Sequence, residues 1–77
     1  MDTLQFVAVR GEERFEITGG DGWGSTVFRY VQGRNTHDYL QADTSKAMGC
    51  AETEWGVPPS AWRRALPGEL PLWEKNK

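Results

Sequence analysis

The residues of this chain best suited to chemistry are Cys50 and His37, the latter followed by Asp38. A thiol, an imidazole and a carboxylate are the components of a cysteine nucleophile with its base. Cys50, however, falls in a predicted helix among small residues. Burial in such surroundings raises the pKa of a thiol and makes it inert, whereas catalytic thiols are partly exposed and electropositive. We therefore expect Cys50 to be a small buried hydrophobe, and we expect no catalytic residues and no enzyme.

Metal and hydrolytic sites are not expected either. One cysteine and one histidine cannot supply the four protein ligands of a structural zinc site. The acidic pair Glu12-Glu13 lies in a predicted turn, and Glu52 and Glu54 flank the end of a predicted helix. Acids in such places are usually solvated, and a hydrolytic pair needs a concave pocket that a small core rarely encloses.

The glycine-rich segment Gly20-Asp21-Gly22-Trp23-Gly24 invites comparison with a phosphate-binding loop, in which glycines let backbone amides approach a phosphate. Its spacing differs from the dinucleotide fingerprint Gly-x-Gly-x-x-Gly, because Ser25 stands at the last position and a strand rather than a helix is predicted to follow. We therefore expect a connecting loop and no cofactor. Trp23 in this loop either packs back over the sheet or is presented to a partner.

Two groups of basic and aromatic residues are typical of nucleic-acid binding: Trp62 beside Arg63-Arg64, and Arg29 between Phe28 and Tyr30. The overall charge argues against this role. Nine basic and eleven acidic residues leave a net charge of −2, so no clustered positive field is available to attract a phosphate backbone. A single-stranded nucleic-acid-binding face made by Phe28, Arg29 and Tyr30 remains the alternative function.

The composition predicts one small core. A chain of 77 residues is below the usual size for two domains, so we expect a single domain over residues 1–77. A chain this short buries only about 60% of its unfolded surface, and its one cysteine cannot form an internal disulfide. Four Trp, three Phe and two Tyr supply apolar surface instead. A shared interface would bury more, so we expect a homodimer.

The beginning of the chain has neither the positive region nor the apolar run of a secretory signal. No stretch approaches the roughly 20 apolar residues of a membrane span. A lone cysteine is typical of a reducing compartment. We expect a cytoplasmic protein without membrane contact.

Alternation of apolar and polar residues predicts the strands. Residues 4–9 and a following run, in which Phe15 and Ile17 face the core while Arg14 and Glu16 face solvent, predict a hairpin. The next strand is the most strand-like part of the chain, because it is apolar on both faces, and we expect it to be central.

This central strand covers residues 25–32 and is followed by a turn signal at residues 33–35. Residues 37–40 then run back as a short fourth strand or lead directly into a helix. We expect the strand.

One helix is predicted from Thr44 to Trp55. Asp43 is a suitable N-cap, since its carboxylate can accept a hydrogen bond from the first turn, and Gly56 followed by two prolines ends the helix. Gly49 costs about 1 kcal/mol of helix propensity relative to Ala, so packing must stabilise the helix. The residues expected near the packed face are Ala47, Met48, Ala51 and Trp55. The small residues expected to allow close approach to a sheet are Ala47, Gly49, Cys50 and Ala51.

Residues 60–66 predict a short second helix of about two turns, which a Pro-Gly pair ends. Residues 67–77 form a carboxyl-terminal tail, in which two prolines exclude a regular helix. Leu70, Leu72 and Trp73 are nevertheless too apolar for a purely solvated end. The tail therefore docks either on its own domain or on a partner.

One stretch resembles a known group of proteins. Asp38-Tyr39-Leu40-Gln41, the small residues Ala47 and Ala51, and Glu54-Trp55-Gly56-Val57-Pro58 followed by Trp62 carry the resemblance. This pattern is similar to one found in small uncharacterised bacterial proteins of mobile or variable genome regions, including integron cassettes and immunity-gene loci. The resemblance lies in the carboxyl-terminal half alone. It implies a sheet with a helix across it and a non-catalytic binding role.

The sequence thus predicts an α+β domain, with an antiparallel sheet of three to four strands, one helix packed across it, a short second helix and an apolar tail. We expect a non-enzymatic protein-interaction module of the immunity, inhibitor or accessory-subunit type, which binds another protein or itself rather than nucleic acid. Trp and Arg dominate interface hot spots. The residues expected to contact the partner are Trp23, Trp62, Arg64, Leu72 and Trp73.

Overall fold

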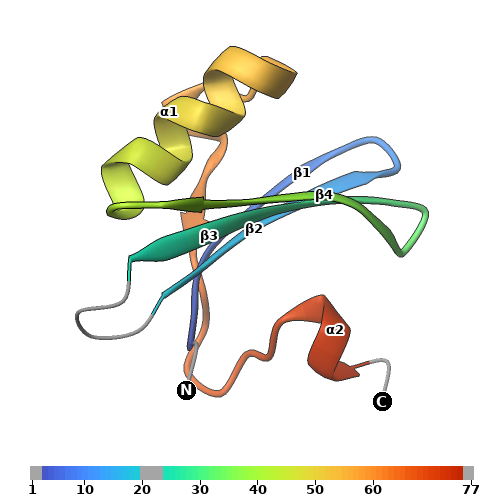
Figure 1. Ribbon diagram of the computed structural model, residues 1–77. Coiled ribbons are helices and arrows are strands. Elements are labelled where there is room, and N and C mark those ends of the chain that lie inside the picture. The colour runs from blue at the N-terminus through green and yellow to red at the C-terminus, as the bar shows by residue number, and fades with distance from the viewer. Residues whose placement is uncertain (1–2, 20–23, 76–77) are drawn as a thin grey trace.

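The chain forms a five-stranded antiparallel sheet with one long helix on one face and the carboxyl-terminal segment on the other (Figure 1). The computed structural model describes residues 3–19 and 24–75. The strands are β1 (Thr3–Arg10), β2 (Glu13–Gly19), β3 (Ser25–Val31), β4 (Arg34–Gln41) and β5 (Arg63–Arg64). The helical elements are α1 (Thr44–Trp55), the 3-10 turn η1 (Pro59–Ala61) and α2 (Leu72–Lys75). The predicted α+β fold, with a helix packed across an antiparallel sheet, is confirmed.

The first four strands form a meander in which each strand pairs with the next, and the full order is β4-β3-β2-β1-β5. β3 and β4 are joined by Gln32-Gly33, whose φ angles are 52° and 80°. Two positive φ angles are characteristic of the type I′ turn, whose twist matches that of the flanking strands. β3 is an interior strand, although β2 rather than β3 takes the middle position. The fourth strand expected at residues 37–40 is present and begins earlier, at Arg34.

The prediction of a short helix over residues 60–66 is wrong. The chain makes only the turn η1 and then extends as β5, in which Arg64 and Arg63 pair with Phe6 and Val7 of β1. The Ala65 amide continues this pairing by donating to the Gln5 carbonyl at 2.9 Å. A helix of two turns is marginal by itself, so pairing with the open edge of β1 outweighs it.

α1 begins and ends where the sequence predicts. The Lys46 amide donates to the Asp43 carboxylate at 2.8 Å, which makes Asp43 the N-cap. Gly56 takes the left-handed conformation, with φ 67°, that closes the last turn without a Cβ clash. α1 has 12 residues, and across residues 3–19 and 24–75 no helix is long and apolar enough to cross a membrane.

The inner face of α1 is only partly as predicted. Ala47 and Ala51 are fully buried against the sheet, and Met48 and Trp55 pack beside them. Gly49 is exposed, and a Cβ atom there would meet nothing within 4 Å. The prediction that close packing explains the small side chains therefore holds for the two alanines and is wrong for Gly49.

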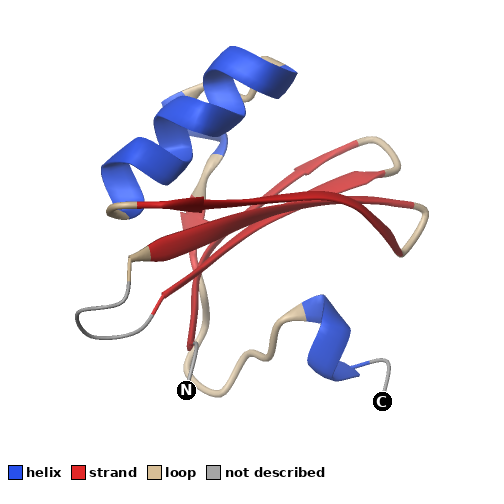
Figure 2. Ribbon diagram, in the orientation of Figure 1, coloured by secondary structure: helices blue, strands red, loops and turns tan. Residues whose placement is uncertain are grey.

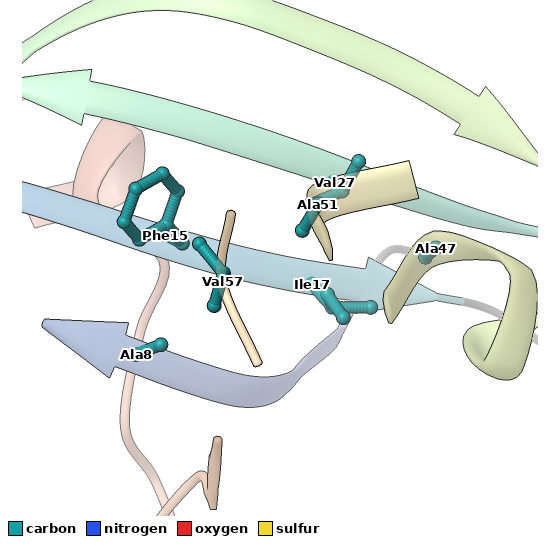
Figure 3. Close-up of a cluster of buried hydrophobic side chains, with 7 residues drawn as sticks. All are labelled: Ala8, Phe15, Ile17, Val27, Ala47, Ala51 and Val57. Atoms are coloured by element: carbon teal, nitrogen blue, oxygen red, sulfur yellow. The ribbon is translucent and has the colours of Figure 1, made fainter. Parts of the chain in front are cut away.

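The apolar core lies between α1 and the sheet (Figure 3). Phe15, Ile17 and Val27 are fully buried here, and burial of each such side chain contributes about 1.5–3 kcal/mol. Within residues 3–19 and 24–75, the cluster comprises Ala8, Phe15, Ile17, Val27, Ala47, Ala51 and Val57. Packed around it are the partly buried Phe6, Met48, Cys50, Trp55 and Trp62. This face of the sheet is called the helix face below.

The opposite face, called the tail face below, is covered in part by the carboxyl-terminal segment that ends in α2 (Figure 2). Pro71 is buried, and Leu72 and Trp73 are half-buried, so the tail docks on its own domain. The four-residue α2 was not expected among the prolines. Its turn is closed by the Glu74 amide, which donates to the Pro71 carbonyl at 3.0 Å, and both prolines lie outside the helix.

Candidate functional site

The contacts of Cys50 and His37 do not activate a nucleophile. The His37 ring packs against Tyr39 and Trp55, with centroids 6.3 and 6.2 Å away. Cys50 is half-buried beside the core, and burial together with the nearby Glu54 carboxylate raises the pKa of its thiol. A thiol with a raised pKa carries little thiolate at neutral pH and is a poor nucleophile.

The described residues do not provide a metal site. Between residues 3–19 and 24–75, no three side chains of His, Cys, Asp or Glu are grouped so that they could hold a metal ion. The glycine segment considered as a phosphate loop, and the predicted contact residue Trp23 within it, lie outside the described residues except for Gly24.

The four described residues that the sequence assigns to partner contact are not brought together. Trp62 packs against the core on the helix face. Arg64 is exposed on β5, with its guanidinium 5.7 Å from the centre of the Phe6 ring. Leu72 and Trp73 lie half-buried on the tail face. These side chains therefore do not make one continuous surface.

The stacking face predicted from Phe28, Arg29 and Tyr30 is not formed, because neighbouring residues of a strand point to opposite faces. Arg29 lies opposite Phe15 on the helix face and donates twice to the Glu13 carboxylate, at 3.1 and 2.9 Å. Phe28 and Tyr30 lie on the tail face, where Tyr30 is only 3% exposed. Burial, with the negative charge of nearby Glu16 adding to it, raises the pKa of Tyr30 to about 12.

A buried carboxylate anchors the tail. The side chain of Glu16 is completely buried, although the alternation of its strand predicted that it would face solvent. It accepts a hydrogen bond from Arg14 at 2.7 Å and from the Leu72 amide at 3.0 and 3.2 Å. Buried charge is costly unless it is paired and hydrogen-bonded, so Glu16 requires both partners. The solvent exposure predicted for Glu16 is therefore wrong, because the tail covers this part of the sheet.

A second carboxylate ties the tail to β5. Glu69 accepts hydrogen bonds from both terminal nitrogens of Arg63, each at 2.9 Å, and from the Leu66 amide at 2.8 Å. The Arg63 guanidinium is the main reason that the pKa of Glu69 falls to about 2, and the Leu66 amide and the charge of Arg14 lower it further. Glu16 and Glu69 are thus both polar anchors of the tail.

The two edges of the sheet differ in length and exposure. β5 closes one edge with only two residues, whereas β4 forms the other edge with eight, of which seven are exposed. The backbone groups on the outer side of an edge strand have no partner in the sheet, which makes a long exposed edge a template for another strand. β4 is therefore the candidate functional site.

Apolar side chains lie on both sides of this edge. Tyr39 is 36% exposed on the helix face, and its ring lies 5.8 Å from that of Trp55, which in turn stacks on Phe15 at 5.6 Å. Leu40 lies on the tail face and is 71% exposed. The sequence interpretation did not assign these two residues to a site. Two adjacent apolar residues in a predicted strand are nevertheless a usable signal, because they put apolar surface on both faces of that strand.

Comparison with known proteins identified no relative of this chain. No family model, no curated protein and no solved structure matches the chain. The geometry of β4 and its surroundings is therefore the basis for inferring a function.

Proposed function

We propose that this protein is a non-enzymatic protein-interaction module that binds an extended segment of its partner along the outer edge of β4. The observation that supports this proposal most directly is the exposure of seven of the eight residues of this edge strand. In strand addition, main-chain hydrogen bonds provide affinity and the side chains on either face provide specificity.

The pairing of β2 with β3 indicates which main-chain groups of β3 turn toward β4. The Gln32 amide donates to the Glu12 carbonyl at 3.1 Å, one step beyond the pair Glu13–Val31. Hydrogen-bonded and non-hydrogen-bonded pairs alternate along an antiparallel ladder. Even-numbered residues of β3 therefore direct their main-chain groups to β2, and the odd-numbered residues direct theirs to β4.

The same alternation defines the free edge of β4. Val27 and Arg29, which turn toward β4, lie opposite Tyr39 and His37. Tyr39 and His37 therefore use their main-chain groups within the sheet. The N–H and C=O groups of Asp38 and Leu40 point away from β3 and are available to a partner.

The side chains near these groups favour an apolar partner segment. An added strand would contact Tyr39 and Trp55 on the helix face and Leu40 on the tail face. Aromatic and aliphatic cross-strand pairs stabilise such an edge contact.

A module of this kind acts by occupying another protein, as immunity proteins, inhibitors and accessory subunits do. The raised pKa of Cys50 agrees with a role that needs no nucleophile. We place the protein in the cytoplasm, where a lone thiol stays reduced.

Replacing Leu40 with Pro tests the proposal. Proline removes one outward N–H, and edge strands tolerate proline where that N–H faces solvent. Extract from the source cells is passed over immobilised wild type, Leu40→Pro and Leu66→Ala, the last a control at a 66% exposed leucine beyond β5. Proteins retained by wild type and the control but lost with Leu40→Pro support the proposal. Equal retention on all three, with circular dichroism showing that each is folded, contradicts it.

A further inference from the structure

We infer that the segment bound along β4 is β4 of a second copy of this chain, related to the first by a two-fold axis through Tyr39. The inference rests on the proposed function, because it names the occupant of the same edge. The two antiparallel sheets would then continue into each other across the paired β4 strands. Three properties of β4 select this partner and this register: the length of its regular part, the direction of its main-chain groups and its charge.

A β-bulge limits the regular part of the edge. Arg29 pairs with His37, but the next residue of β3 pairs with Asn35, which leaves Thr36 as an extra residue in β4. Asn35 and Thr36 both donate side-chain hydrogen bonds to the Arg29 carbonyl, at 3.2 and 3.3 Å. A bulge bends its strand and interrupts pairing on that side. The uninterrupted edge is therefore residues 37–41, and Tyr39 is its middle residue.

The main-chain groups fit self-pairing about Tyr39. In this register Asp38 of each copy lies opposite Leu40 of the other, and these are the residues whose N–H and C=O groups point outward. Both pairs can therefore be hydrogen-bonded. Tyr39 then faces Tyr39 of the second copy in a non-hydrogen-bonded pair, the arrangement that brings opposed side chains closest.

The charge of the edge disfavours the neighbouring registers. Residues 37–41 contain one acid, Asp38, and none of the Lys, Arg or Pro residues that often protect an edge strand. Centring the pair on Asp38 would oppose two like charges, which is destabilising. Centring it on Leu40 would leave only residues 39–41 of each strand in the pairing, because β4 ends at Gln41. The Tyr39 register avoids both problems.

The apolar surfaces on the two faces would also become continuous. The rings of Phe15, Trp55 and Tyr39 contact one another in a row from the core to the edge, so contact between the two Tyr39 rings would join the clusters of the two copies. On the tail face, the two exposed Leu40 side chains would lie diagonally across the junction, within reach of each other. With one cysteine the domain cannot form an internal disulfide, and its core is small, so burying this apolar surface would stabilise it.

Cysteine cross-linking tests both partner and register. Tyr39→Cys, prepared with Cys50→Ala so that it holds the only thiol, should form a disulfide-linked dimer on mild oxidation. Opposed residues of a non-hydrogen-bonded pair have Cα atoms about 4.5 Å apart, within disulfide range. In the same background, Asp38→Cys and Leu40→Cys would place their thiols on Cα atoms about 8 Å apart, beyond that range.

Cross-linking at position 39 should be at least about tenfold faster than at 38, 40 or the exposed control position in Leu66→Cys, as followed on non-reducing gels. Because Tyr39 contacts Trp55, a second measurement leaves Tyr39 unchanged. His37→Cys mixed with Gln41→Cys should give a disulfide-linked heterodimer, since residues 37 and 41 are opposed in this register. Faster linkage at 38 or 40, or equal linkage at every position, overturns the inference.

Sedimentation of the unmodified chain separates this inference from the proposed function. Wild type should dimerise with rising concentration, and Leu40→Pro should remain monomeric over the same range. A wild type that stays monomeric up to about 1 mM overturns self-pairing. Suppose that wild type stays monomeric but immobilised Leu40→Pro fails to retain proteins that immobilised wild type retains: the proposed function then stands. If Leu40→Pro retains all of them, both proposals fail.

Discussion

The two faces of the sheet are covered by different kinds of contact. On the helix face, Ala47 and Ala51 of α1 press against the fully buried Phe15 and Ile17, all of them apolar. On the tail face, the chain covers apolar side chains as well, but it also closes over a buried carboxylate, Glu16. Apolar burial is non-directional and roughly proportional to the area removed from water. A buried ion pair is directional and stabilises the fold only while every partner is in place.

This difference assigns separate roles to the two coverings. The helix face holds the connected apolar cluster, whereas the tail face mixes buried apolar residues such as Val7 and Tyr30 with the buried carboxylate. We therefore expect the helix face to contribute the larger share of the folding free energy. The tail face is held by the partners of Glu16 and Glu69, so losing a single hydrogen-bonding group there should loosen the tail before the core. The following substitutions test this division.

Removing the largest core side chain should have the largest effect. Phe15→Ala is expected to reduce the free energy of unfolding by about 3–5 kcal/mol, through lost apolar burial and the cavity that remains. Chemical denaturation followed by tryptophan fluorescence measures the change. A loss below about 2 kcal/mol would mean that the helix face does not dominate stability.

Breaking the buried ion pair should cost slightly less. Arg14→Met leaves the Glu16 carboxylate without its cation and should lower stability by about 3 kcal/mol. The double variant Arg14→Met/Glu16→Leu removes both charges and should regain part of that loss, because no unpaired charge stays buried. Recovery should be incomplete, because the Leu72 amide still lacks its acceptor. Denaturant titration of both variants measures the recovery.

Amide hydrogen exchange of Arg14→Met reports on the tail. This substitution should increase the exchange rate of residues 69–75 more than that of α1. Uniform acceleration in both regions would contradict separate roles for the two faces.

Glu69 should make the stability of the tail depend on pH. Its pKa falls from 4.5 to about 2 in the folded chain, so its contribution is fully present above pH 4.5 and disappears as the pH falls toward 2. Glu69→Gln should lower the free energy of unfolding by about 1 kcal/mol at pH 7, through its weakened hydrogen bonds. The difference in unfolding free energy between Glu69→Gln and wild type should shrink as the pH falls from 4.5 toward 2. Urea titrations from pH 7 to pH 2 test this, and a difference independent of pH contradicts it.

Gly49→Ala should have the smallest effect, and in the stabilising direction. The site is exposed and a new Cβ would meet nothing within 4 Å, so the change alters helix propensity without altering either face. The expected gain is about 0.5–1 kcal/mol in thermal or denaturant unfolding. Ala51→Gly is the matched control, since it loses propensity and buried packing together. A destabilising Gly49→Ala would indicate a contact at the outer surface of α1.

The limits of α1 could be predicted because helix caps are local. Asp43 and Gly56 act within one turn of themselves, so the sequence contains the whole signal. β5 could not be predicted in this way. Its stabilising partner is β1, at the far end of the chain, and local propensity favoured a helix at residues 60–66.

Glu16 shows why the solvent exposure of the tail face could not be predicted. Alternation correctly placed Glu16 on the face opposite Phe15, but whether that face meets solvent depends on where residues 67–75 lie. The candidate edge has a similar limit. Tyr39 and Leu40 are visible as apolar residues in a strand, but the strand order that leaves them at an edge is a property of the assembled sheet.

The meander also bears on how quickly the chain folds. From β1 to β4, consecutive strands pair with each other, so little chain entropy is lost in closing the loops between them. Hairpins of this kind form within about 1–10 μs. The contact between β1 and β5 spans most of the chain and carries the main loop-closure cost. With one such distant strand pairing among several sequential ones, folding should be faster than in sandwiches of similar size.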